Sequence, residues 1–369
     1  MFFLIIYILL VSSIYLFLVF YYLVKWSTYE NSDQEISNKR DAISLLIPAY
    51  NEGESLVKLV NSLQNQTFSK ENFEIIIIDD YSSIPCEKLL EDVCFGELDI
   101  RVLQNTHPKG KKYALLTGAE NAVNQWIVST DADCIPHDSW LETFAESFAK
   151  HKPKFIAGPV KMIYGDSFFQ KFQALEFASL VGVGAASFTA NSPIMCNGAN
   201  LAFDKYLFIE AFSELKAEIN TGDDMFLMEY AKKHFPTEMI FLKNKKAVVN
   251  TKVESGLFNF AKQRIRWSSK SFFYSDKTLI SISLLIFLLN LNIILCLALG
   301  FKSIEMLYIA LIQYGIKSVV DFFFLGKFLK FLDQKSLMKM FIPVQLVYPF
   351  YIVIAACFGL IKSINYRNA

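Results

Sequence analysis

The stretch Trp126-Ile127-Val128-Ser129-Thr130-Asp131-Ala132-Asp133 decides the fold of the central part of this chain. A buried strand is expected over 126–130, and two aspartates follow it directly. In open α/β sheets, ligands bind beyond the carboxyl ends of the strands. Two carboxylates held close together there are suited to a divalent cation on a diphosphate. D-x-D alone is a weak signal, because it occurs by chance in many proteins.

Similar apolar runs precede this stretch and predict a sheet. Their length and continuity are typical of strands buried on both faces of a parallel sheet. Segments with helical spacing lie between them, at 52–63 and 111–123. The expected fold class is therefore α/β with a parallel sheet. The expected strands are 43–47, 73–78, 100–103 and 126–130.

Polar motifs follow the strands. Pro48-Ala49-Tyr50-Asn51-Glu52 comes after the first, Asp79-Asp80 after the second, and Asp131 to Asp133 after the fourth. Any one of them, taken alone, is more often a helix cap or a turn than a ligand site. Because they fall at the same end of parallel strands, together they predict a ligand site on one edge of the sheet.

Membrane-length apolar segments flank this central region. The chain is 53% hydrophobic, with 35 Phe and 17 Tyr, whereas soluble domains are about 45–50% apolar. Residues 1–24, 278–301 and 340–361 carry no charged side chain, and each exceeds the ~20 residues that cross a bilayer. A fourth span is expected at 304–325. It contains Lys317 and Asp321, which lie four residues apart and can pair inside a bundle.

The basic residues predict the orientation of these spans. Residues 1–24 lack a preceding positive charge and a cleavage site, so they are expected to be an anchor and not a signal peptide. Four lysines crowd the link between the last two spans, which places that link in the cytoplasm. Residues 25–277 are then cytoplasmic, in a multi-pass protein of the cell membrane. The four lysines are Lys327, Lys330, Lys335 and Lys339.

Charge and cysteine content exclude some classes of partner. The 36 basic and 36 acidic residues give a net charge of zero, so no nucleic-acid partner is expected. The six cysteines show no C-x-x-C spacing, and most fall in the region assigned to the reducing cytoplasm. Free thiols and no structural zinc are expected.

Two further stretches predict amphipathic helices. Residues 168–190 and 257–273 combine apolar residues at helical spacing with a few charges, as in helices that lie on a membrane surface. For the first, packing against the sheet is an equally good interpretation by periodicity alone. The second is basic and runs straight into a span, which favours contact with lipid headgroups.

The succession PAYNE, IIDDYSS, PKGKKYAL, STDADC, CNGANLAF, TGDD and QRIRW resembles the membrane-bound family-2 glycosyltransferases. That group includes cellulose, chitin and hyaluronan synthases and ceramide glucosyltransferase. The resemblance covers about residues 43–270. It implies a GT-A-type domain at 43–254, after a linker at 25–42 and before an interfacial helix at 255–277. It also implies one transmembrane helix before the domain and a bundle after it.

The resemblance implies roles in donor binding for specific residues. Asp79 and Asp80, with Pro48, Tyr50 and Glu52, are expected to hold the base and ribose of a nucleotide-diphospho-sugar, with a UDP-sugar as the expected donor. Lys111 is a candidate contact of the diphosphate. Asp131 and Asp133 would place Mg²⁺ or Mn²⁺ on that diphosphate. The donor-binding residues are Pro48, Tyr50, Glu52, Asp79, Asp80, Lys111 and Asp131.

The resemblance also implies catalytic and acceptor-binding roles for specific residues. Asp223 matches the general base and Asp224 the acid beside it, although Gly222 replaces the glutamate of the family's usual T-E-D. Gln263, Arg266 and Trp267 lie at i, i+3 and i+4, so one helix face can present them to a diphosphate and an acceptor sugar. For Arg266 and Trp267, anchoring at the membrane interface is the alternative.

The function that these residues favour is an inverting glycosyltransferase at the cytoplasmic membrane face. Its acceptor would be a lipid or a growing glycan. One alternative is a processive polysaccharide synthase that exports its polymer, since Q-x-x-R-W is shared by both branches. Another is a non-catalytic membrane scaffold or a transporter subunit, for which Lys317 and Asp321 could serve a transport path.

Overall fold

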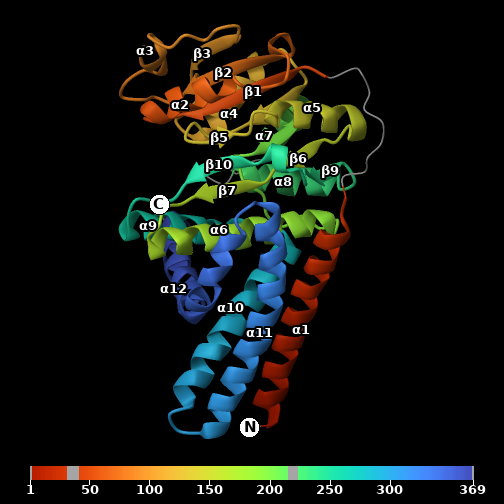
Figure 1. Ribbon diagram of the computed structural model, residues 1–369, viewed down its shortest axis with the longest axis vertical. Coiled ribbons are helices and arrows are strands. Elements are labelled where there is room, and N and C mark those ends of the chain that lie inside the picture. The colour runs from red at the N-terminus through yellow and green to blue at the C-terminus, as the bar shows by residue number, and fades with distance from the viewer. Residues whose placement is uncertain (1, 31–40, 215–222, 368–369) are drawn as a thin grey trace. The chain divides into compact units, whose positions relative to one another are not determined.

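The computed structural model describes residues 2–30, 41–214 and 223–367 (Figure 1). Contacts divide the chain into two compact units. The first, called here the sheet unit, comprises Tyr29–Ile163 and Ser187–Lys252. The second, called the helical unit, comprises Met1–Thr28, Tyr164–Ala186 and Val253–Ala369.

The sheet unit is built on a seven-stranded sheet with the order β3-β2-β1-β4-β8-β6-β9. All four strands expected from the sequence are present, with ends that differ by at most two residues. Every residue of β1, β2 and β4 is buried, as expected for strands covered on both faces. The strands are β1 Ile43–Ala49, β2 Phe73–Asp79, β3 Ile100–Gln104, β4 Trp126–Ser129, β6 Phe155–Ala157, β8 Leu201–Asp204 and β9 Met239–Phe241.

The sheet is mixed, so the expectation of a parallel sheet is correct only in part. β1 runs parallel to β2 and β4, and β2 runs parallel to β3. β8 is antiparallel to both β4 and β6. Apolar continuity reports that a strand is buried on both faces, but it carries no information on direction. The reversal at β8 could therefore not be predicted from that pattern.

A second, three-stranded sheet has the order β5-β10-β7. β10 Val249–Lys252 pairs in parallel with β7 Val160–Ile163 and antiparallel with β5 Ile135–Pro136. β5 has only two residues, and β7 and β10 contain polar residues and are only partly buried, so none of them gives the continuous apolar run that predicted β1 to β4. β5 follows the D-x-D stretch directly, so this small sheet fixes the chain just beyond the aspartates.

Helices pack against the large sheet. α4 contacts β1 and β2, and a Cβ at its Gly118 would lie 2.9 Å from Ile78 Cδ1. Glycine leaves room there for the close packing of the helix on the buried side chains of the sheet. The helices of the sheet unit are α2 Glu54–Leu63, η1 Lys70–Asn72, α3 Cys86–Leu90, α4 Lys111–Asn121, α5 Trp140–His151, α7 Lys205–Phe212, α8 Asp223–His234 and η2 Lys245–Ala247.

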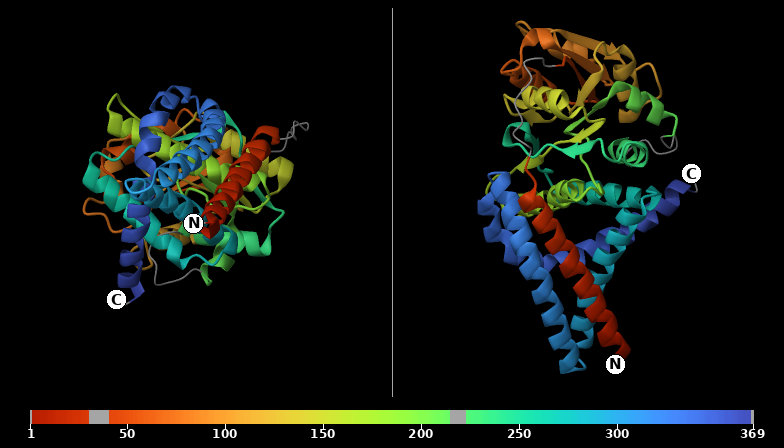
Figure 2. Two further views of the ribbon diagram at one scale, coloured as in Figure 1. Left: turned by 90° about the horizontal axis from the view of Figure 1, so that it is seen from below. Right: turned by 90° about the vertical axis from the view of Figure 1, so that its right-hand side faces the viewer.

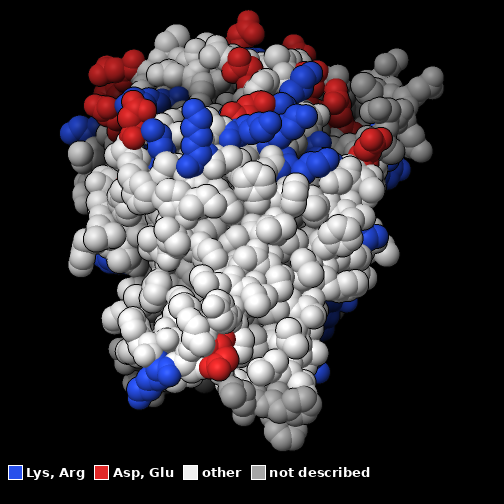
Figure 3. Space-filling model, turned by 60° about the horizontal axis from the view of Figure 1, so that its bottom comes forward, with Lys and Arg blue, Asp and Glu red and all other residues white. Residues whose placement is uncertain are grey.

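The helical unit contains the long apolar helices. Among the described residues, four helices are long and apolar enough to cross a membrane, at Leu4–Thr28, Lys277–Leu299, Ile304–Phe331 and Lys335–Ile364. They coincide with the four expected spans. Figure 2 shows α1, α10 and α11 side by side, and Figure 3 shows a broad surface with few charged side chains. The elements are α1 Phe2–Thr28, α6 Phe168–Thr189, α9 Leu257–Lys270, η3 Ser271–Phe273, α10 Lys277–Leu299, α11 Ile304–Phe331, η4 Lys335–Met340 and α12 Phe341–Arg367.

A buried ion pair joins three of these helices. Lys317 Nζ lies 2.7 Å from Asp321 Oδ2 on α11, which confirms the expected pairing. Lys317 also donates to Gln345 Oε1 of α12 at 2.8 Å, and Tyr15 Oη of α1 donates to Asp321 Oδ1 at 2.6 Å. Charges inside an apolar bundle are tolerated when they are paired in this way.

The buried carboxylate of Asp204 holds the end of β8 in place. It is fully buried and caps α7 by accepting the backbone N–H groups of Tyr206 and Leu207. Its Oδ2 also accepts from Gln125 Nε2 at 2.7 Å and from Lys154 Nζ at 3.1 Å. Burial alone would raise the pKa of Asp204, but these hydrogen bonds and the Lys154 charge lower it overall.

We predict that Asp204→Asn lowers the free energy of unfolding by about 1–3 kcal/mol at pH 7. The amide keeps the shape of the side chain but removes the charge that Lys154 faces. Because the folded-state pKa is lowered, this stabilisation is present above the unfolded-state pKa of about 3.9 and is lost as the pH falls through the folded-state value. The difference between wild type and variant should therefore shrink at pH 3.

Urea unfolding of the full-length protein at the two pH values measures this difference. Glu54→Gln is the matched control, because Glu54 is highly exposed and pairs with the exposed Lys58. It should leave the unfolding midpoint unchanged. Equal midpoints for wild type and Asp204→Asn at pH 7 would contradict the prediction.

Candidate active site

The carboxyl ends of β1, β2 and β4 lie together on one edge of the large sheet. In the parallel pairing of β1 with β2, Ala49 is opposite Asp79; in its pairing with β4, Leu46 is opposite Ser129. The motifs that follow these strands therefore emerge at the same edge. This confirms the expected convergence of the polar motifs.

Asp79 and Asn51 shape the loops after β2 and β1. Asp79, which is 4% exposed, accepts the N–H groups of Ser82 at 2.8 Å and Cys86 at 2.9 Å. Asn51 has a φ of 56° and donates its N–H to Ser82 Oγ at 3.0 Å. Its Oδ1 accepts from the Ser83 N–H at 2.8 Å. Both oxygens of Asp79 are thus used within its own loop, so Asp79 sets the shape of the loop.

The predicted residues of the first motif differ in exposure. Pro48 is buried in β1 opposite Ile78. Tyr50 is exposed, and its ring centroid lies 3.5 Å from Lys109 Nζ. This distance is within the range of a cation–π contact. An aromatic face and a positive charge are therefore available to a ligand at this edge.

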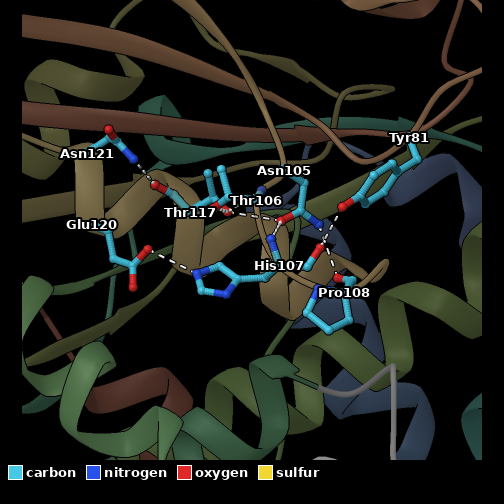
Figure 4. Close-up of polar contacts among 8 residues, drawn as sticks. All are labelled: Tyr81, Asn105, Thr106, His107, Pro108, Thr117, Glu120 and Asn121. Carbon is cyan, nitrogen blue, oxygen red and sulfur yellow. Dashed lines mark hydrogen bonds and ion pairs between the residues drawn. The ribbon is translucent and has the colours of Figure 1, made fainter.

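Asn105 organises the loop between β3 and α4 (Figure 4). Its Nδ2 donates to Asp80 Oδ1 at 2.7 Å and to Pro108 O at 3.2 Å. Its Oδ1 accepts from the His107 N–H and from Thr117 Oγ1, both at 3.0 Å. Asn105 is 2% exposed, so these bonds satisfy a buried amide. No sequence signal marked this residue.

Asp80 uses this loop to fix the start of α4. Both of its carboxylate oxygens accept the Gly110 N–H at 3.0 Å. Gly110 has a φ of 146°, which favours glycine. The next residue, Lys111, begins α4 and forms an ion pair with Asp131. Asp80 thus positions the lysine that faces the D-x-D stretch.

Asp131 and Asp133 bring two carboxylates together, as the sequence predicts. Their oxygens and Cys134 Sγ all lie within 4.8 Å of one another. Burial and the charge of Asp131 raise the pKa of Asp133. Burial also raises the pKa of the Cys134 thiol, whose side chain is fully buried. The two carboxylates are therefore the ligands available to a hard cation here.

Glu52 adds a third acidic group to this cluster. Burial, with the charges of Asp133 and Asp131, raises the pKa of Glu52 to about 7. Lys252 and Lys111 act in the opposite direction. Negative charge thus exceeds positive charge among these residues, and a bound cation would reduce their repulsion.

The segment Cys196 to Asn200 brings Asp224 to the same cluster. The Gly198 N–H donates to Asp224 Oδ2 at 3.0 Å, and Asp224 Oδ1 accepts the Met225 N–H at 2.9 Å. A Cβ at Gly198 would lie 3.0 Å from Lys111 Nζ and 3.4 Å from Asp224 Oδ2. Lys111 and Asp224 therefore meet at the same backbone position, and glycine leaves room for both.

Asp223 begins α8, directly before Asp224. Its side chain, together with Thr221 and Gly222, lies outside the part of the chain that the structure describes. The role of Asp223 as general base stays a prediction.

Gln263, Arg266 and Trp267 lie on α9 in the helical unit, whereas the other predicted residues belong to the sheet unit. Arg266 is exposed, but Gln263 and Trp267 are half-buried. Gln263 Nε2 donates to Glu254 Oε1 at 2.6 Å. The Trp267 ring centroid lies 6.2 Å from that of Phe177 on α6. Two of the three residues are thus held by contacts within the unit.

Similarity to known proteins identifies the part of the chain that holds this acidic edge as a glycosyltransferase domain with a GT-A-like fold. The sequence pattern described as "Glycosyl transferase family 2" matches residues 44–209. The chain therefore carries a family 2 glycosyltransferase domain.

Named relatives match only part of this chain. Glycosyltransferase AglE of Haloferax volcanii is 26% identical over 122 residues, which are 33% of this chain and 40% of AglE. Poly-beta-1,6-N-acetyl-D-glucosamine synthase of Staphylococcus epidermidis is 27% identical, over 44% of this chain and 40% of the synthase. WfgD of Escherichia coli, a UDP-Glc:alpha-D-GlcNAc-diphosphoundecaprenol beta-1,3-glucosyltransferase, is 29% identical over 36% of this chain and 51% of WfgD. The matched part of this chain thus spans less than two thirds of each relative.

A solved structure shows the same fold over most of the chain. Mannosyltransferase PcManGT of Pyrobaculum calidifontis, in complex with GDP-Man and Mn²⁺, superposes with a TM-score of 0.52 at 15% identity. The superposition covers 93% of this chain and 97% of that one. At this identity the similarity concerns the fold alone.

Proposed function

We propose that this chain is a membrane-bound, inverting glycosyltransferase that moves a sugar from a nucleotide-diphospho-sugar to a lipid or a growing glycan. The observation that carries the proposal is the cluster of Lys111, Asp131, Asp133 and Asp224 around Gly198. It combines two neighbouring carboxylates that fit a cation, a lysine, and a carboxylate beside a helix start, which are the groups that transfer from a diphosphate donor requires.

Donor binding is assigned to the carboxyl edge of the sheet. The loops shaped by Asp79 and Asp80, with exposed Tyr50, would bind the base and ribose. Lys111 would contact the diphosphate. In the structure Lys111 forms an ion pair with Asp131, which supports assigning both groups to the diphosphate and its counter-ion. WfgD, whose name gives UDP-Glc as donor, supports a UDP-sugar.

Asp131 and Asp133 fit a divalent cation. Mg²⁺ and Mn²⁺ prefer oxygen ligands and commonly take one or two protein carboxylates together with substrate phosphates. The buried thiol of Cys134, with its raised pKa, is a poor ligand for such ions. When bound, the ion would neutralise charge on the diphosphate leaving group.

The reaction needs a base for the acceptor hydroxyl. The hydroxyl oxygen would form the new bond to the anomeric carbon while the bond from that carbon to the diphosphate oxygen breaks. The proton of the acceptor hydroxyl would pass to a carboxylate, which we assign to Asp223. Asp224 is assigned a positioning role, because backbone N–H groups already occupy both of its oxygens. A single displacement of this kind inverts the anomeric configuration.

The acceptor side is assigned to α9, with Gln263, Arg266 and Trp267. We propose residues 43–254 as the catalytic domain and 255–277 as an interfacial helix. The name of WfgD gives a diphosphoundecaprenol-linked acceptor, which supports a lipid. The name of the Staphylococcus epidermidis relative gives a polymer, which supports the alternative of a processive synthase. The size of the product separates these alternatives: a single addition gives one product, whereas a processive synthase gives a series of products of increasing length.

We predict that purified protein releases nucleoside diphosphate from one of a panel of sugar nucleotides when Mg²⁺ or Mn²⁺ and a lipid extract are present. EDTA should abolish this release. Asp133→Asn should reduce it by about 10²-fold or more, because it removes a cation ligand. Cys134→Ser is the matched control and should stay active. Release that persists undiminished in EDTA would refute the metal assignment, and no release from any donor would favour the non-catalytic alternative.

We predict that Asp223→Asn lowers kcat by about 10²-fold or more and leaves donor affinity almost unchanged, since a base acts in the chemical step. Asp224→Asn should instead disturb the Gly198 contact and change both kcat and donor KM. Steady-state kinetics and the anomeric configuration of the product, read by NMR, test the assignment. If Asp224→Asn alone showed the pure kcat loss, the two roles would be exchanged.

We propose that the catalytic domain faces the cytoplasm of the cell. Cys94 is an exposed thiol of the sheet unit, and Lys302 lies in the turn between α10 and α11. A membrane-impermeant maleimide should label Cys94 only after the cells are permeabilised. The same reagent should label a Lys302→Cys variant in intact cells. Labelling of Cys94 in intact cells would contradict this orientation and place the catalytic domain outside the cell.

A further inference from the structure

Arg264 lies among the predicted acceptor residues of α9, but its side chain is buried inside the helical unit. Arg264 Nη2 lies 2.5 Å from Glu176 Oε2 on α6. The two side chains are 4% and 3% exposed. A buried charge costs several kcal/mol unless it is paired and hydrogen-bonded. The pair therefore fixes α9 against α6 where Arg264 and Glu176 meet.

The guanidinium of Arg264 also contacts two of the predicted acceptor residues. Its Nη1 donates to Gln263 Oε1 at 2.5 Å, and Gln263 in turn donates to Glu254. The guanidinium carbon lies 4.2 Å from the centroid of the Trp267 ring, within cation–π range. One side chain thus orients both Gln263 and Trp267.

α12 supplies a second partner for Glu176. Tyr351 Oη donates to Glu176 Oε1 at 3.1 Å. The Tyr351 ring centroid lies 5.7 Å from that of Phe172 on α6 and 5.9 Å from that of Phe260 on α9. Three helices therefore meet around one carboxylate.

Stability alone does not account for this pair. Replacing a buried ion pair with apolar residues of similar volume is often neutral or stabilising. Arg264 Nε also has no hydrogen-bond partner among the described residues, which is a further cost of the arginine. What an apolar pair could not do is donate to Gln263 and hold the Trp267 ring.

We propose that Arg264 and Glu176 are positioning residues for the acceptor side of the reaction. They hold Gln263 and Trp267 in one orientation, and Tyr351 ties that orientation to α12. The inference rests on the proposed function, since it assigns Gln263 and Trp267 to the acceptor. The geometric part can be tested without any activity.

The test uses full-length protein in detergent, labelled with 5-fluorotryptophan. The chain has four tryptophans, and Trp267→Phe assigns the resonance of Trp267. Glu176→Gln keeps the side-chain shape but removes the charge that holds Arg264. It should shift or broaden the Trp267 resonance and leave those of Trp126 and Trp140 unchanged. Tyr351→Phe removes one bond to Glu176 and should cause a smaller shift, so it replaces Glu176→Gln if that variant does not fold.

Asp321→Asn is the matched control, because it breaks a second ion pair of the helical unit, that of Asp321 with Lys317. It should lower the melting temperature without moving the Trp267 resonance. An unchanged Trp267 resonance in Tyr351→Phe and in folded Glu176→Gln would overturn the proposal. An equal shift in Asp321→Asn would also overturn it, because the change would then reflect general loosening of the bundle.

Kinetics provide the second readout. With saturating donor and a total lipid extract as the acceptor probe, Glu176→Gln should raise the half-saturating amount of extract about tenfold, the effect of losing one charged hydrogen bond. The donor KM should stay within about twofold. A change in donor KM alone would overturn the assignment to the acceptor side. If wild type releases no nucleoside diphosphate but the Trp267 resonance responds as expected, the proposed function fails and the positioning pair stands.

Discussion

Crowded negative charge at the carboxyl edge of the sheet is the constraint on which the rest of the candidate site depends. Burial and the charges of Asp133 and Asp131 raise the pKa of Glu52, and burial and the charge of Asp131 raise the pKa of Asp133. Nearby opposite charge reduces repulsion of this kind. Lys111 supplies part of it through its ion pair with Asp131. The loop before Lys111 is in turn held by the buried side chains of Asn105 and Asp80. These hydrogen bonds fix the position of the lysine.

That support is made largely of backbone hydrogen bonds to carboxylates. Asp79 and Asp80 accept backbone N–H groups of the loops beside them, and Asp224 accepts that of Gly198. Carboxylates used in this way hold irregular backbone in place at low cost, because an ionised acceptor forms a stronger hydrogen bond than a neutral one. The aspartates of the motifs are therefore of two kinds. Some fix the loops, and Asp131 and Asp133 remain for a ligand.

The helical unit also contains charged side chains that need a partner, and there the surroundings are apolar. Lys317 and Asp321 pair within α11, and Arg264 pairs with Glu176 between α9 and α6. Both pairs recruit polar side chains from neighbouring helices, since buried charges need hydrogen bonds as well as a counter-charge. The first lies in a helix long and apolar enough to cross a membrane. The second lies beside the residues assigned to the acceptor, which gives it a role in orientation as well as in packing.

The sequence by itself determined four strands of the large sheet, β1 to β4, together with the long apolar helices and the shared edge of the polar motifs, because periodicity and length follow directly from burial. It also placed Asp131 and Asp133 together, since one intervening residue separates them. Only the tertiary structure decided the antiparallel direction of β8, the central place of Asn105, and the pairing of Arg264 with Glu176. Those features depend on contacts between segments 25 to 88 residues apart, and no local pattern records which distant residue a buried polar group will meet.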